Sequence, residues 1–312
     1  MSFPALPVTW SLDGFEFNVG ADAYGHSTIV DVPEWDNAPG PKPRFTERTE
    51  GHGAYAGPGY RAGKPLTIQG TAIASSPQSR EALRDRLAAL CLDPDTLYPL
   101  TCSNPYRDQD LTTWVKLYDV PDIRRHPDGV SLTLDIPVFA PDPWKYSTPN
   151  PTASTGLASP GLEGILWNGS PAASGGIEWN GSPAVSGGLI YEAGGGQSGI
   201  LRLTNSGTVP APITFTITST AINPRLIAIQ TQQRLRWLGT VSGANYLTLD
   251  TNNRRVTLGS TTEDQVNVNG SLVESDFFTV PPGSYIDVEY ADESTPGSSG
   301  SQVFAVNSNV YA

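Results

Sequence analysis

Paired carboxylates are the residues of this chain whose types and spacing come closest to catalytic chemistry. A glycoside hydrolase needs two carboxyl groups that face each other across a sugar, with the pKa of one raised by burial. Asp93-Pro-Asp95 is typical of a turn, and Asp287 and Glu289 fall on the outer face of one expected strand, which favours solvation over catalysis. No pair stands out, so glycoside hydrolysis is the weakest of three hypotheses. The pairs are Asp93 with Asp95, Asp119 with Asp122, Glu263 with Asp264, and Asp287 with Glu289.

Metal and nucleophile motifs give no stronger signal. The three histidines, His26, His52 and His126, lie in polar, Gly- or Pro-rich settings, and none are paired at i, i+4 as on a zinc-protease helix. We expect them to be solvated loop residues. The run GPGYRAGKP has Pro58 and Pro65 where a phosphate loop needs Gly and Ser or Thr. We therefore expect no enzyme, no metal and no cofactor.

Aromatic residues near turns are the remaining candidates for a binding site. Residues 164–175 and 176–187 agree at ten of twelve positions, and a third copy begins at Gly188. This repeat places three aromatics at a regular interval, either as a ladder for glycans or a partner, or as packing residues of short strands joined by Asn-Gly and Gly-Gly turns. The candidate glycan- or partner-binding aromatics are Trp167, Trp179 and Tyr191 in the repeat and Trp237 and Tyr246 beyond it.

The elements that must position these residues are mostly strands. Apolar residues alternate with polar ones in segments such as Leu132-Thr-Leu134-Asp-Ile136 and Ile213-Thr-Phe215-Thr-Ile217, the period of half-buried antiparallel strands. One segment differs: after Ser76 and Pro77, leucines at 83, 87 and 90 share one helical face. The pattern predicts an all-β fold with one amphipathic helix near 77–91.

Composition sets the number of domains and the class of partner. The 312 residues are 38% hydrophobic and include 60 Gly and Pro, which suits two β domains with many tight turns. We expect a β domain over 1–147, a Gly/Pro/Ser-rich connector over 148–199 that holds the repeat, and a second β domain over 200–312. A net charge of -12 argues against sequence-specific nucleic-acid binding. The N-terminus MSFPALPVTWSLDG has no export signal, and no run is long enough to span a membrane.

The order of several short segments resembles a known family. The one helix lies within TIQGTAIASSPQSREALRDRLAAL, a sheet closes with LTLDIPVFAPDPWKY, and a second β domain contains LRLTNSGTVPAPITFTITS, YLTLDTNNRRVTLG, FFTVPPGSYIDVEY and VFAVNSNVYA. This arrangement resembles the distal tail proteins of long, non-contractile-tailed bacteriophages, also described as siphovirus-type tail components or minor tail proteins. The 164–187 repeat departs from the family pattern.

The resemblance implies a structural protein of the virion tail tip, assembled in the host cytoplasm. It implies a homo-hexameric ring of N-terminal domains, of sandwich or barrel-like fold, around the DNA channel, with galectin-like C-terminal β-sandwiches outside it. The implied partners are other copies of the chain, the tail tube protein, and the tail-tip hub and fibre proteins. The alternative is a carbohydrate-binding module that contacts host cell-wall glycans through its C-terminal domain; a ring with sugar-binding arms would satisfy both hypotheses.

Overall fold

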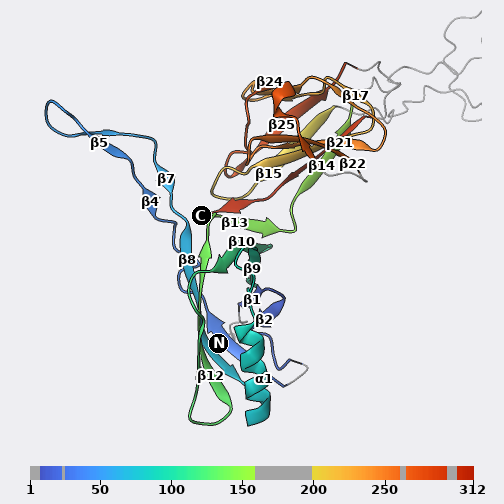
Figure 1. The fold of residues 1–312 in the computed structure, drawn as a ribbon. Coiled ribbons are helices and arrows are strands. Elements are labelled where there is room, and N and C mark those ends of the chain that lie inside the picture. Colours follow the sequence, from blue (N-terminus) through green and yellow to red (C-terminus); the bar gives the residue numbers. More distant parts are fainter. Residues whose placement is uncertain (1–7, 23–24, 159–198, 261–264, 294–300) are drawn as a thin grey trace, which may run out of the picture. The chain divides into compact units, whose positions relative to one another are not determined.

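The chain forms two compact units, which are described separately. The computed structural model describes residues 8–22, 25–158, 199–260, 265–293 and 301–312. Unit 1 comprises residues 1–150, 205–211 and 308–312, and unit 2 comprises residues 151–204 and 212–307 (Figure 1). Within the described ranges, no helix is both long and apolar enough to cross a membrane. The prediction of an all-β fold with one amphipathic helix is confirmed.

Unit 1 is built on an antiparallel sheet with the strand order β2-β1-β9-β10-β12-β8-β3, to which β11, β13 and β27 add. Its inward residues alternate along each strand and form one apolar core. The strands are β1 (Thr9–Leu12), β2 (Phe15–Phe17), β3 (Ser27–Asp31), β8 (Lys64–Ile73), β9 (Tyr98–Ser103), β10 (Asp110–Leu117), β11 (Asp122–Arg125), β12 (Ser131–Ala140), β13 (Lys145–Thr148) and β27 (Val310–Tyr311).

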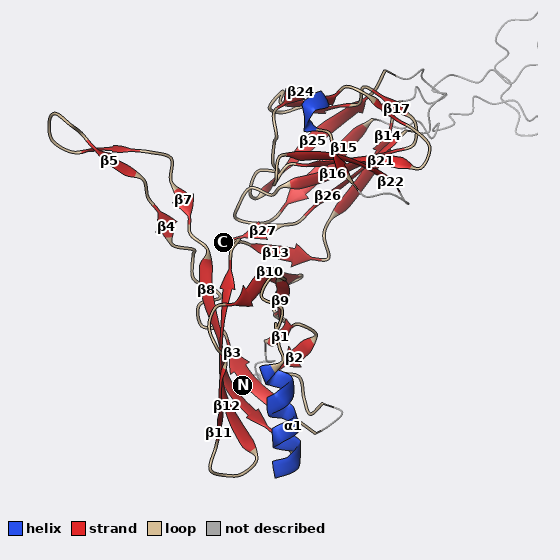
Figure 2. Ribbon diagram, in the orientation of Figure 1, coloured by secondary structure: helices blue, strands red, loops and turns tan. Residues whose placement is uncertain are grey.

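The helix predicted near 77–91 is α1, Pro77–Ala88, which lies against the sheet beside β12 (Figure 2). Ser76 caps it: its side chain accepts a hydrogen bond from the Ser79 amide, and Pro77 occupies the first helical turn. Leu83 and Leu87 are fully buried. The apolar face of the helix therefore closes one side of the unit 1 core.

Asn18 joins the two edges of the sheet in unit 1. Its Oδ1 accepts a hydrogen bond from the Val30 amide at 2.7 Å, and its Nδ2 donates to the carbonyl oxygens of Val8 and Val30, both at 2.8 Å. The backbone amide of Asn18 donates to Thr28 Oγ1, and its φ of 61° is a left-handed conformation that Asn tolerates. One side chain thus supplies the hydrogen bonds that a neighbouring strand would give and brings the sheet close to a barrel.

Residues 205–211 and 308–312, far along the sequence, complete unit 1. Strand β27 pairs with β13, and Val209 forms a bridge with Val310. Asn309 is 4% exposed; its backbone exchanges hydrogen bonds with Ser147, and its side chain bonds both Gln109 and the Ser206 amide.

Unit 2 consists of two antiparallel sheets with alternating buried residues and two short additional strands. Phe215 of one sheet lies 5.8 Å from Phe278, ring centroid to centroid, in its core. The first sheet has β14 (Thr152–Gly156), β26 (Gln302–Asn307), β16 (Ile213–Thr218), β21 (Asn245–Asp250), β22 (Arg255–Ser260) and β23 (Val266–Asn267); the second has β15 (Ile200–Asn205), β25 (Ser284–Ala291), β18 (Arg225–Ala228), β19 (Arg234–Trp237) and β24 (Leu272–Ser275); β17 (Ala221–Ile222) pairs with β20 (Thr240–Val241), and η1 (Asn269–Ser271) is a 3-10 turn.

Candidate functional site: an exposed arm on an acidic unit

The most unusual feature of unit 1 is a long hairpin between β3 and β8, here called the arm and defined as residues 40–61. Strands β4 (Pro41–Lys42) and β7 (Tyr60–Arg61) pair near its base, and β5 (Phe45–Glu47) and β6 (Ala54–Ala56) pair further out (Figure 1). Every residue of the arm is exposed. Three large apolar side chains are among them, namely Phe45 at 70%, Tyr55 at 62% and Tyr60 at 57%.

The arm has its own internal contacts. The Arg48 guanidinium lies 5.0 Å from the ring centroid of Tyr55, and Arg44 lies 5.7 Å from that of Tyr60. Gly51 and Gly53 supply positive φ angles of 97° and 93° at the tip. A two-stranded ribbon with no packed face is marginally stable in water. An exposed arm of this kind therefore gains little stability from its own contacts.

Two buried lysines hold the base of the arm. Lys64 Nζ donates to the carbonyl oxygens of Trp35 at 2.8 Å and Asn37 at 2.6 Å, and Lys145 Nζ donates to the same Trp35 carbonyl at 3.0 Å. Lys145 also lies 5.6 Å from the centroid of the Trp35 ring. Burial, and then the charge of Lys145, lower the pKa of Lys64 to about 8; burial likewise lowers the pKa of Lys145.

We expect this lysine to make stability depend on pH. Because the folded pKa of Lys64 is below its usual 10.5, the unfolded chain binds the proton more tightly. The contribution of Lys64 to the free energy of unfolding is then lowest below pH 8 and rises as the pH goes from 8 towards 10.5. The free energy of unfolding should be measured by urea unfolding for wild type and for Lys64→Met. Between pH 7.5 and pH 10, the difference between the two proteins should shift by about 2 kcal/mol in favour of wild type. The variant keeps every other titrating group, so it serves as the control. If the difference in the free energy of unfolding between wild type and the variant does not change with pH, the expectation is contradicted.

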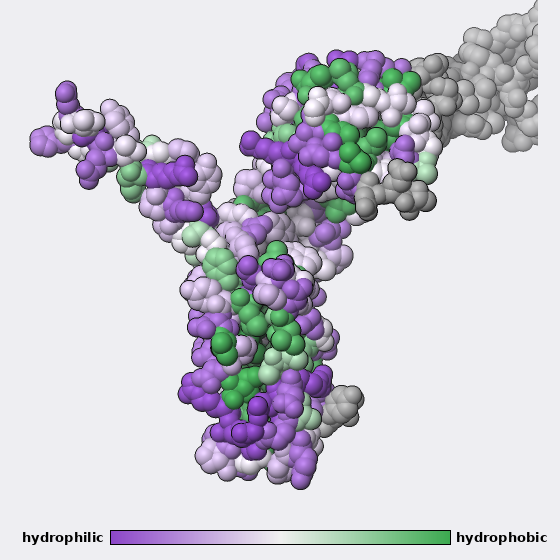
Figure 3. Space-filling view, in the orientation of Figure 1, coloured by the Kyte–Doolittle hydropathy of each residue, from purple (hydrophilic) through white to green (hydrophobic). Residues whose placement is uncertain are grey.

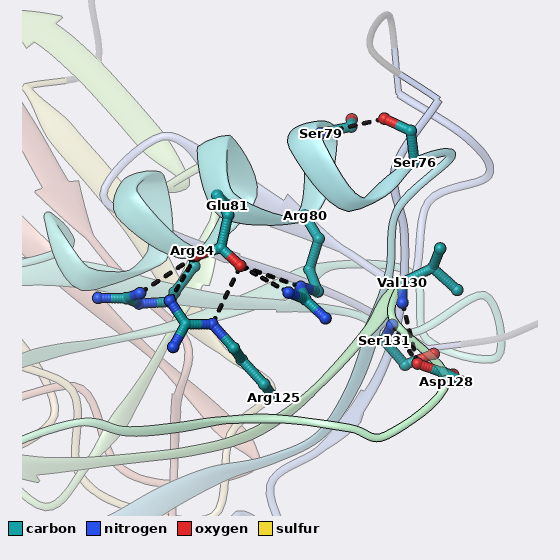
Figure 4. Close-up of polar contacts among 9 residues, drawn as sticks. All are labelled: Ser76, Ser79, Arg80, Glu81, Arg84, Arg125, Asp128, Val130 and Ser131. Carbon is teal, nitrogen blue, oxygen red and sulfur yellow. Dashed lines mark hydrogen bonds and ion pairs between the residues drawn. The ribbon is translucent and has the colours of Figure 1, made fainter.

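Ion pairs on the surface join α1 to β11. Glu81 accepts hydrogen bonds from Arg80 at 2.7 Å, Arg84 at 3.2 Å and Arg125 at 2.7 Å (Figure 4). The bond from Arg125 is the largest cause that lowers the pKa of Glu81 to about 2. Exposed pairs add little stability, so their effect is mainly to fix how the helix lies on the strand.

His26 corrects one expectation from the sequence: it is 4% exposed rather than solvated. Its Nε2 lies 2.6 Å from Ser79 Oγ and its Nδ1 lies 3.2 Å from Asp22 Oδ2, the order of contacts in a catalytic triad. The Ser79 amide, which an oxyanion would need, already donates to Ser76 Oγ. The cluster therefore fastens the loop before β3 to the start of α1.

The aromatics singled out in the sequence lie in different environments. Trp237 is 5% exposed, and a Cβ on Gly239 would lie 2.3 Å from its Cη2 atom, so its ring faces the protein. Tyr246 is half-buried, and Gln265 donates to its hydroxyl at 3.4 Å. Trp167, Trp179 and Tyr191, with the whole repeat, lie outside the described residues.

A polar cluster on unit 2 had no distinct signal in the sequence. Arg202 forms a two-point ion pair with Asp287, at 2.8 and 3.1 Å, and Gln230 also donates to Asp287 at 3.0 Å. The Arg202 guanidinium lies 4.5 Å from the ring centroid of Tyr285, which is 47% exposed. As predicted, Asp287 and Glu289 share the outer face of one strand. The cluster joins β15 to β25, two strands more than eighty residues apart, which sequence spacing could not bring together.

Together these features define a two-unit all-β protein whose unusual surfaces are suited to contacts with other proteins. In the described ranges, no three His, Cys, Asp or Glu side chains gather as a metal site. Figure 3 shows that the arm is largely hydrophilic, with isolated apolar residues.

Comparison with known proteins identifies the relatives of this class. Residues 206–296 match the family model described as siphovirus-type tail component, C-terminal domain. The resemblance to siphovirus-type tail components is thereby confirmed. No curated protein matches the sequence.

Solved structures extend the likeness to both units. The chain resembles the crystal structure of SPP1 Dit (gp 19.1), described as a paradigm of the hub adsorption apparatus in Gram-positive infecting phages, with a TM-score of 0.58 and 12% identity over 98% of this chain and 100% of that one. At this identity the match shows a shared fold. The phage P2 baseplate in its activated conformation with Ca also matches, with a TM-score of 0.49 and 10% identity over 96% of this chain and 98% of that one.

Proposed function

We propose that this chain is a structural protein of a bacteriophage tail tip, with no catalytic activity. In the virion it forms a hexameric ring that joins the tail tube to the tail-tip hub and receptor-binding fibres around the DNA channel, after assembly in the host cytoplasm. The observation that carries the proposal is the match of residues 206–296 to siphovirus-type tail components. The full-length fold similarity to SPP1 Dit supports it.

Each part of the chain has a role in this proposal. Residues 1–147 form the ring, residues 148–199 connect the two domains, and residues 200–312 form a galectin-like domain outside the ring, except that the segments 205–211 and 308–312 complete unit 1. The exposed arm of unit 1 supplies a surface that a ring would cover. The net charge of -12 would keep DNA from adhering to the channel wall during ejection.

The first test is the mass of the particle in solution. Light scattering across a wide range of concentrations should give six times the 33.2 kDa of one chain, and images of the same sample should show closed rings. Tail tube and hub proteins should bind the ring, and an unrelated β-sandwich protein serves as the control for both. A monomer at every concentration that also binds neither partner would contradict the proposal.

Binding of host cell-wall glycans is the alternative. The feature that favours it is Tyr285, 47% exposed, whose ring has Arg202 over one face and Asp287 and Gln230 nearby, because sugars are bound by an aromatic face flanked by hydrogen-bonding groups. Glycan screening of the full chain decides between a sugar-binding second domain and one that contacts only proteins.

A further inference from the structure

The arm carries a charge opposite to that of the unit from which it extends. It has four basic residues, Lys42, Arg44, Arg48 and Arg61, and two acidic ones, Glu47 and Glu50, for a net charge of +2. The rest of unit 1 has nine basic and seventeen acidic residues, for a net charge of -8. A surface that attracts the arm is therefore present on every copy of the chain.

One face of the unit 1 sheet collects acidic groups in a row. Asp31 of β3 is opposite Gln69 of β8, Gln69 is opposite Asp135 of β12, and Asp135 is opposite Asp122 of β11. Residues directly opposite in antiparallel strands point to the same face, and all four are exposed. Asp122 is ion-paired with Arg124 of the same strand, so Asp31 and Asp135 are the two carboxylates of the row that a second copy would meet. We call this row, with its neighbours on the same side of these strands, the acidic face.

Apolar surface accompanies the charges on the acidic face. Ile29, two residues before Asp31 and therefore on the same side of β3, is 71% exposed. It is opposite Thr71, which is opposite Thr133. The arm brings Phe45, Tyr55 and Tyr60, each more than half exposed. The two surfaces are thus complementary in both charge and apolar character.

The acidic face is open within its own unit. The arm does not cover the acidic face of its own unit, because Asp31, Gln69 and Asp135 are exposed alongside an exposed arm. The two lysines that bond Trp35 and Asn37 fix the chain where the arm begins. The complementary face is therefore free for another copy.

We propose that the arm of one copy lies on the acidic face of a second copy, with Lys42 and Arg48 near Asp31 and Asp135 and with the arm aromatics over Ile29. The proposal rests on the self-association proposed above and names the surfaces that mediate it. Contact in one direction from each copy to the next is a head-to-tail contact, which closes a ring when the rotation between neighbouring copies completes a full turn.

Charge exchange tests this contact in the full-length chain. Sedimentation equilibrium should show that Lys42→Glu with Arg48→Glu weakens self-association roughly 10-fold or more. Asp31→Lys with Asp135→Lys should weaken it similarly, and a mixture of the two double variants should associate with each other. Arg234→Glu with Arg255→Glu makes the same charge change at exposed positions of unit 2 and should leave the assembly unchanged. Circular dichroism melting checks that each variant is folded.

A photo-crosslinking residue at Phe45 gives a readout that does not depend on the charge variants. Crosslinks should join the arm of one copy to residues 27–31, 64–73 or 131–140 of another. Rings that form equally well with the reversed arm, or crosslinks only to other regions, overturn this contact and leave the proposed ring standing. A wild-type chain that neither self-associates nor crosslinks between copies overturns both.

Discussion

Replacing Asn18 by Ala should lower the free energy of unfolding of unit 1 by about 4 kcal/mol. The side chain makes three hydrogen bonds, to the Val30 amide and to the carbonyl oxygens of Val8 and Val30. Its loss leaves these backbone groups unpaired where the sheet edges meet, at about 1 to 3 kcal/mol for each group that water cannot reach. Ala also tolerates a φ of 61° less well than Asn does. Hydrogen exchange of the amides of β1 and β3 measures the loss.

Asn18→Gly is the matched variant, because Gly adopts the left-handed conformation freely. It should lose the same hydrogen bonds without the backbone strain, and so should be about 1 kcal/mol less destabilised than Asn18→Ala. If Gly restores wild-type stability, the effect lies in the backbone and not in the side-chain bonds that close the sheet.

Replacing Asn309 by Ala should destabilise unit 1 by about 3 kcal/mol, although the residue is distant in sequence from the strand that it supports. The variant loses the bonds of the Asn309 side chain to Gln109 and to the Ser206 amide, both 2.8 Å. Asn309 is 4% exposed and both bonds are partly buried, so the loss of each costs more than the loss of a surface bond would. Protection of the β13 amides against hydrogen exchange should fall.

Ser308→Ala is the control for this prediction. Ser308 bonds the side chain of Asn150 at 2.8 Å in an exposed position, and its loss should change stability by less than 1 kcal/mol. Equal effects of the two substitutions would show that the buried bonds of Asn309 have no special role. A two-unit chain need not unfold in one step, so peptide-resolved exchange is preferable to a single melting curve.

Local patterns in the sequence predicted the elements that depend on nearby residues. Ser76, Pro77 and the spacing of Leu83 and Leu87 define α1, and the alternation in Ile213–Thr218 defines β16. Both signals come from residues within a few positions of each other. The segments form the helix and the strand that these local signals predict.

Features that depend on distant contacts had no such signal. The arm sequence is rich in Gly and Pro and lacks alternation, because neither of its faces is buried. The burial of His26 depends on Ser79, 53 residues away. Whether Trp237 faces the protein or the solvent depends on its packing against Gly239 in the folded unit, which its position near a turn does not reveal.

The pairing of β27 with β13 has a consequence for synthesis of the protein on the ribosome. Ser147 and Asn309, which bond each other in unit 1, are 162 positions apart in the chain. Translation at about 5 to 20 residues per second separates their emergence by roughly 8 to 30 seconds. During that interval the nascent chain holds a first unit in which β13 lacks this neighbour, so unit 1 reaches its final form only after most of unit 2 has been made.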